Sequence, residues 1–101
     1  MQPVPMTYPE LLIAIAEGSR PRQQKVCITL LGESVMHIWR WRCRGRPCEH
    51  AAHQIVAHDY GRFVGPENSG LRRLVLNEDG RSQASAFRSL RDDARRQGAT
   101  S

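Results

Sequence analysis

Tryptophan and arginine alternate with a period of two near the middle of the chain, and this pattern constrains the fold more than any other. Residues 39, 41 and 43 are Trp, Trp and Cys, whereas residues 40, 42 and 44 are all arginine. Successive side chains of a β-strand point to opposite faces, so the pattern predicts a strand from about Val35 to Cys43. One face of that strand has the large apolar area of a core. The other face is left for solvent or a partner.

The flanking segments predict how this strand is embedded. Residues 26–31 are rich in β-branched side chains and predict a strand that pairs with it through a turn at residues 32–34. A helix is expected from Thr7, which forms a T-x-x-E capping box with Glu10, to Gly18. Further elements are expected at residues 48–63 (helix), 71–76 (strand), 77–80 (turn) and 82–97 (helix).

These elements predict an α+β fold in the order α-β-β-α-β-α. A small antiparallel sheet built on the β-hairpin would pack against about three helices. The helix at residues 48–63 would bury a stripe at i, i+3, i+4 spacing that consists of Ala52, Ile55, Val56, Tyr60 and Phe63.

The length of 101 residues predicts one domain over residues 1–101. Residues 1–6 and 98–101 are expected to be flexible ends. No apolar run approaches the ~20 residues that cross a bilayer, and the N-terminus lacks a basic, signal-like segment. A cytoplasmic protein without a membrane partner is the expectation.

The positive charge is confined to one segment of the chain. The formal net charge is +5, yet residues 20–46 contain seven cationic residues and one anion, Glu33, while the rest of the chain is slightly acidic. A local field of this kind attracts phosphate backbones or an acidic protein face.

We therefore expect a small accessory or regulatory protein that binds nucleic acid, DNA rather than RNA, through an arginine-rich hairpin. The contact residues would be Arg40, Arg42, Arg44 and Arg46, with the footprint extended by Arg20, Arg22 and Lys25. The alternative is a non-catalytic modulator or inhibitor, of the type found in phages and plasmids, that docks on an acidic face of a host complex. The apolar Met36 and Ile38 leave a homodimer open.

A cysteine–histidine cluster follows the arginine strand. Cys43, Cys48, His50 and His53 are potential zinc ligands within eleven residues. The stretch Pro47-Cys48-Glu49-His50 resembles the tail of a SWIM zinc finger, in which a C-x-C pair on a hairpin is completed by C-x-H at a helix start. The resemblance implies zinc and binding of DNA or protein. Because Trp41 stands in place of the other hairpin cysteine, no metal or other cofactor is favoured, and zinc on these four residues is the alternative.

No catalytic constellation is recognisable in the sequence. It contains no glycine-rich phosphate loop, no H-E-x-x-H motif and no pair of carboxylates with acid–base spacing. We expect a protein that is not an enzyme.

Overall fold

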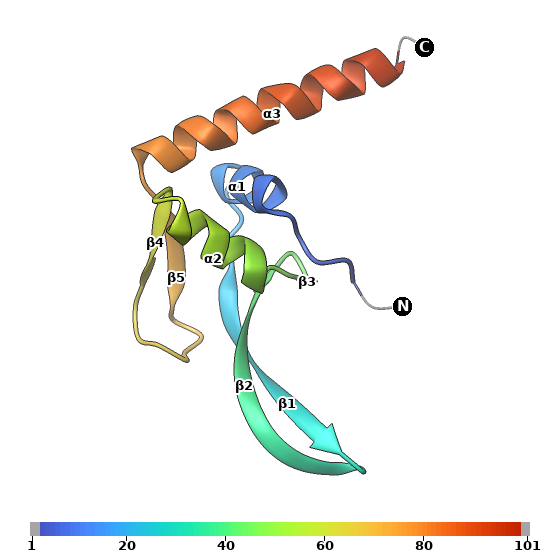
Figure 1. Cartoon of the computed structure of the whole chain (residues 1–101), viewed down its shortest axis with the longest axis vertical. Helices are drawn as coiled ribbons and strands as arrows, with labels where there is room; N and C mark the ends of the chain where they lie inside the picture. The colour runs from blue at the N-terminus through green and yellow to red at the C-terminus, as the bar shows by residue number, and fades with distance from the viewer. Residues whose placement is uncertain (1–2, 100–101) are drawn as a thin grey trace.

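The computed structural model describes residues 3–99 and confirms the α+β fold. The helices are α1 (Tyr8–Ala16), α2 (Glu49–Ala57) and α3 (Glu78–Ala99). The strands are β1 (Arg22–Leu30), β2 (Glu33–Cys43), β3 (Arg46–Pro47), β4 (Gly61–Val64) and β5 (Arg73–Leu76). The helices gather at one end of the molecule, and the β1–β2 hairpin projects from the other (Figure 1).

The strands form one antiparallel sheet in the order β3-β2-β1-β5-β4. β1 pairs with β2 along its whole length, but β5 meets β1 only at the pair Arg22–Arg73. β3 pairs with β2 only near the base of the hairpin, at Arg42 and Cys43. Residues 24–40 therefore extend beyond the other strands as a two-stranded ribbon, which we call the arm.

The core lies on one face of the sheet. Trp41 and Cys43 enter it from β2, and Leu74 and Leu76 enter it from β5, each no more than 6% exposed. The helices cover these side chains with fully buried leucine and isoleucine residues of α1 and α2, namely Leu11, Leu12 and Ile55. The prediction that alternate, apolar residues of the tryptophan strand face the core is therefore confirmed where that strand crosses the body of the protein.

The predicted start of α1 is confirmed. Thr7 and Glu10 form the reciprocal capping box, and Gly18 follows the helix with a φ of +98°. Just before the helix, Met6 is buried and its N–H donates to the carbonyl oxygen of Pro47. The expected flexible ends fall partly on residues 1–2 and 100–101, which lie outside the described residues.

The helix expected at residues 48–63 is too long. α2 ends at Ala57, Asp59 adopts a left-handed φ of +60°, and the N–H of Tyr60 donates to Ile55. The chain then turns into β4, an unexpected strand. A Cβ on Gly61 would lie 2.7 Å from the carbonyl oxygen of Val75, so only glycine allows β4 to approach β5 this closely.

Two expected turns also lie elsewhere. The hairpin tip is formed by Leu31 and Gly32, both with positive φ, rather than by residues 32–34. The segment 77–80 is the first turn of α3, because the Asn77 side chain accepts a hydrogen bond of 2.8 Å from the N–H of Gly80. Among the described residues, no helix is long and apolar enough to cross a membrane.

Candidate nucleic-acid interface

Within residues 3–99, no helix covers the face of the sheet opposite the core, which we call the open face. The strand pairing shows which residues lie on the open face, because residues directly opposite each other in an antiparallel sheet point to the same side. Arg42 pairs with Arg22, and Arg22 pairs with Arg73. Arg40 lies two residues from Arg42, and Arg62 pairs with Val75, two residues from Arg73. These five arginines share the open face.

We call Arg22, Arg40, Arg42, Arg62 and Arg73 the arginine cluster. Four of its side chains are exposed, and Arg42 is half-buried. Within residues 3–99 no member forms an ion pair with a carboxylate. Neighbouring strands lie about 4.8 Å apart, and residues i and i+2 of a strand about 6.7 Å apart. The cluster is therefore a two-dimensional array of uncompensated positive charge.

The row Arg42–Arg22–Arg73 opposes folding electrostatically. Like charges directly opposite each other on adjacent strands are destabilising. The row contains two such pairs, Arg22 with Arg42 and Arg22 with Arg73. Since these side chains have no internal counterion, a bound polyanion would relieve the repulsion.

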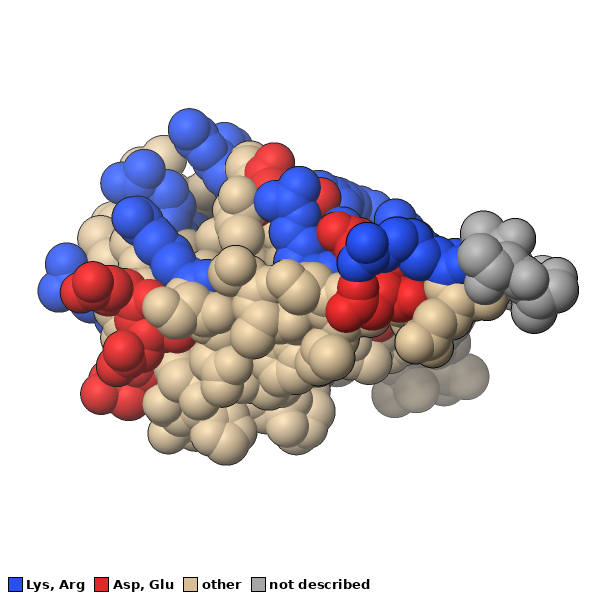
Figure 2. All heavy atoms as spheres, turned by 90° about the horizontal axis from the view of Figure 1, so that it is seen from above, with Lys and Arg blue, Asp and Glu red and all other residues tan. Residues whose placement is uncertain are grey.

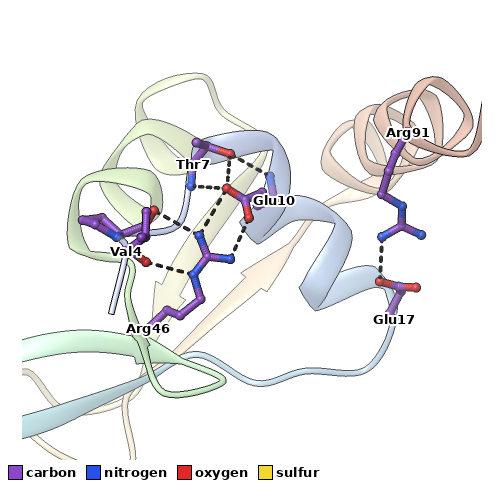
Figure 3. A network of polar contacts seen from close by, with 7 residues as sticks. Val4, Thr7, Glu10, Glu17, Arg46 and Arg91 are labelled. Carbon is purple, nitrogen blue, oxygen red and sulfur yellow. Dashed lines mark hydrogen bonds and ion pairs between the residues drawn. The ribbon is translucent and has the colours of Figure 1, made fainter. Parts of the chain in front are cut away.

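Arg46, a predicted contact residue, is occupied inside the protein (Figure 3). Its guanidinium forms an ion pair of 2.7 Å with Glu10, and it donates to the carbonyl oxygens of Val4 and Pro5. The same contact lowers the pKa of Glu10 from its ordinary value of 4.5 to about 2. Arg46 therefore ties β3 to the N-terminal segment and points away from the open face.

Two other predicted contact residues, Arg44 and Lys25, also lie outside the arginine cluster. Arg44 lies in the turn between β2 and β3, with a φ of +52°, and its Nε donates to the Ser19 hydroxyl. Lys25 pairs with Trp39 and so points to the core side of the ribbon. Of the seven predicted residues, the structure brings Arg22, Arg40 and Arg42 together and places Arg20 in the connection to β1.

Arg62 and Arg73 were not among the predicted contact residues. Arg62 lies in β4, which was expected to be the end of a helix, and Arg73 joins the row only because β5 pairs with the distant β1. The strand predicted at residues 71–76 is the local signal, because side chains of a strand alternate and Arg73 would then lie on the face opposite Leu74 and Leu76, which are buried.

Three arginines of α3, namely Arg88, Arg91 and Arg96, are neutralised by nearby carboxylates. Arg91 binds Glu17, the residue that caps the end of α1, at 3.3 Å (Figure 3), and Arg88 lies 3.9 Å from the same carboxylate. Arg96 pairs with Asp93 on the helix itself. In the view onto the α3 end, cationic residues lie mostly along one side of the molecule and much of the other side is neutral (Figure 2). Arg88 and Arg91 thus attach α3 to the end of α1.

The distal part of the arm is apolar and nearly uncharged. Between Lys25 and Arg40 the only charged side chain is Glu33. The open-face side of this region is formed by Val26, Ile28, Leu30, Met36 and Ile38. Leu30 is 65% exposed and Met36 is 53% exposed. The open face thus has a positively charged part, where the arm joins the rest of the sheet, and an apolar part at the tip of the arm.

The four candidate zinc ligands do not converge. Cys43 and Cys48 are buried thiols, whereas His50 is exposed and His53 contacts Glu49 at 3.1 Å. Burial raises the pKa of Cys43, and burial together with the neighbouring Cys43 and Glu49 raises the pKa of Cys48 to about 12. Within residues 3–99 no three His, Cys, Asp or Glu side chains are grouped as metal ligands. The two thiols pack as small apolar side chains.

The chain matches no known family model, no curated protein and no solved structure.

Proposed function

We propose that this protein binds nucleic acid through the arginine cluster, as a non-catalytic accessory or regulatory protein. The observation that carries the proposal is the cross-strand row Arg42–Arg22–Arg73, which has no carboxylate partner within the described residues. Arginine suits this role because its planar, always-charged guanidinium matches the geometry of phosphate oxygens.

The arm favours duplex DNA over duplex RNA. A two-stranded ribbon fits the major groove of B-DNA, whereas the major groove of A-form RNA is too deep and narrow for side chains to read. The apolar side chains near the tip, such as Ile28 and Met36, could then contact thymine methyl groups, while Arg40 and Arg42 at the base bind the backbone.

The test is fluorescence anisotropy with labelled duplex DNA and single-stranded RNA. The variant Arg22→Gln/Arg40→Gln/Arg42→Gln removes three charges from the cluster and leaves the core untouched. A matched control, Arg88→Gln/Arg95→Gln/Arg96→Gln, removes the same charge from α3. Circular dichroism verifies that both variants fold.

We expect binding that weakens as salt rises from about 50 to about 200 mM, because phosphate contacts release condensed counterions. The cluster variant should lose most of this binding, and the α3 control should retain it. Equal losses in the two variants would show that net charge, and not the open face, attracts the probe. Absence of binding at low salt would refute the proposal.

A specific observation favours a second function, docking on a protein. The apolar tip is larger than phosphate binding requires, and contiguous exposed apolar surface marks interaction sites. The open face is positively charged where the arm begins and apolar at its tip, so it fits a partner that has an apolar patch next to acidic groups. The variant Ile28→Gln/Met36→Gln, which changes only exposed side chains, should abolish capture of such a partner. It should keep the salt dependence of DNA binding, because the arginines that contact phosphates remain. Persistence of capture would eliminate the arm as the docking site.

A further inference from the structure

A pocket of about 700 Å³ adjoins the arginine cluster, at the place where β1 separates from β5. The separation follows from the pairing, since β1 meets β5 only at Arg22–Arg73 and the remaining edge of β5 has no strand beside it. The connection from α1 to β1, which contains Pro21, forms the opposite wall. Its volume lies within the range of small-molecule sites, about 300–1,000 Å³.

Three arginines from different parts of the chain line this pocket. Arg20 comes from the α1–β1 connection, Arg73 from β5 and Arg81 from the first turn of α3. All three side chains are exposed, and none forms an ion pair or side-chain hydrogen bond within residues 3–99. No aspartate or glutamate lines the pocket. Its polar side chains are therefore suited to an anion.

The rest of the lining is apolar. Pro21, Leu74 and Leu76 are buried at its base, and Ile15 is half-buried beside them. A ligand that uses the whole pocket needs an anionic group for the guanidinium groups and an apolar or planar part for this base. A phosphorylated nucleoside has both parts, because arginines bind phosphate through paired N–H donors and the face of a nucleobase packs on apolar or guanidinium surfaces.

The position of the pocket relative to the arginine cluster indicates the source of this phosphorylated nucleoside. Arg73 belongs both to the pocket and to the row Arg42–Arg22–Arg73. A strand whose phosphates follow that row would reach the pocket at its end. We propose that the pocket binds a phosphorylated nucleoside at the end of a nucleic-acid strand, an inference that rests on the proposed function.

The experiment compares ligands that share this chemistry and differ in source. An internally labelled short DNA duplex is prepared with and without terminal phosphates, and its binding is measured by anisotropy. Binding of adenosine 5′-monophosphate, adenosine and inorganic phosphate is measured by calorimetry. The pocket variant is Arg20→Gln/Arg81→Gln, and the control is Arg62→Gln, which lies in the cluster but outside the pocket.

We expect the terminal phosphate to tighten duplex binding about tenfold or more, since hydrogen bonds between charged groups are the strong class. The pocket variant should lose this gain, whereas Arg62→Gln should weaken both duplexes by the same factor. Adenosine 5′-monophosphate should bind more tightly than adenosine or phosphate alone. Duplexes that bind equally well with and without terminal phosphates would overturn the strand-end assignment.

The remaining outcomes separate this inference from the proposed function. If the nucleotide binds and no duplex does, the nucleic-acid function fails while the nucleotide chemistry of the pocket stands, with a free nucleotide as its ligand. If the duplex binds without end preference and the nucleotide does not bind, the pocket inference fails and the function of the cluster stands.

Discussion

Neutralising Glu10 should destabilise the protein by weakening the contact that ties β3 to α1. The change Glu10→Gln suits the test because glutamine can still accept the capping-box hydrogen bond from the N–H of Thr7. What it removes is the carboxylate charge that faces Arg46 at 2.7 Å.

The magnitude follows from the pKa of Glu10. Its fall from 4.5 to about 2 sets a ceiling of about 3 kcal/mol, at ~1.4 kcal/mol for each tenfold change in affinity for the proton. Because the Glu10 side chain is 43% exposed, solvent screening reduces the expected loss to about 1 kcal/mol. A loss of this size lowers the melting temperature by about 4–8 °C in a domain of this length.

The lowered pKa of Glu10 also determines how the stability difference between wild type and Glu10→Gln changes with pH. A carboxylate whose pKa is lower in the folded state stabilises the protein fully above its unfolded pKa, and the contribution disappears as pH falls through the folded pKa. The difference between wild type and Glu10→Gln should therefore be complete at pH values above about 5 and shrink from pH 4.5 towards 2. Urea unfolding followed by tryptophan fluorescence measures it. A difference that stays constant between neutral pH and about pH 3 would refute the ion-pair explanation.

The other predictions concern packing, thiol reactivity and anion binding. Gly61→Ala should destabilise the protein by about 1–3 kcal/mol, measured by thermal unfolding, because its Cβ would meet the carbonyl oxygen of Val75; a neutral effect would mean that β4 can shift. A thiol reagent at neutral pH should label one cysteine quickly in the native protein, the exposed Cys27, and label Cys43 and Cys48 only on unfolding; rapid labelling of all three would contradict the buried assignment. Sulfate should raise the melting temperature more in wild type than in Arg22→Gln/Arg42→Gln, because an anion relieves cross-strand repulsion; equal shifts would remove that argument for the cluster.

Local signals predicted the parts of the fold whose partners are close in sequence. The capping box at Thr7 and Glu10 and the faces of the β1–β2 hairpin depend on contacts within a few residues or across one turn. The helix expected at residues 48–63 failed for the opposite reason. Tyr60 and Phe63 have helical spacing from Val56, yet they pack against the core after the chain has left the helix. The spacing of apolar residues indicates which side chains are buried. It does not distinguish a side chain buried on the helix from one buried after the helix has ended.

The candidate site could be predicted only in part. The hairpin arginines were expected on one face, and Arg22, Arg40 and Arg42 lie there. Arg46 was expected to be free, but its partner, Glu10, lies 36 residues away in the sequence. Arg73 enters the cluster through the pairing of β5 with the distant β1, and Arg62 was missed because residues 48–63 were expected to be helical. Long-range pairing therefore decides which arginines can act together.

Phosphate binding by the open face can be measured through the salt dependence of DNA affinity. Each phosphate contact contributes about −0.9 to the slope of log K against log salt concentration. If Arg22, Arg40 and Arg42 each contact a phosphate, the slope of the Arg22→Gln/Arg40→Gln/Arg42→Gln variant should be shallower than that of wild type by about 2.7. The α3 control, Arg88→Gln/Arg95→Gln/Arg96→Gln, should keep the wild-type slope. An unchanged slope in the cluster variant, or the same reduction in both variants, would contradict the assignment of phosphate binding to the open face.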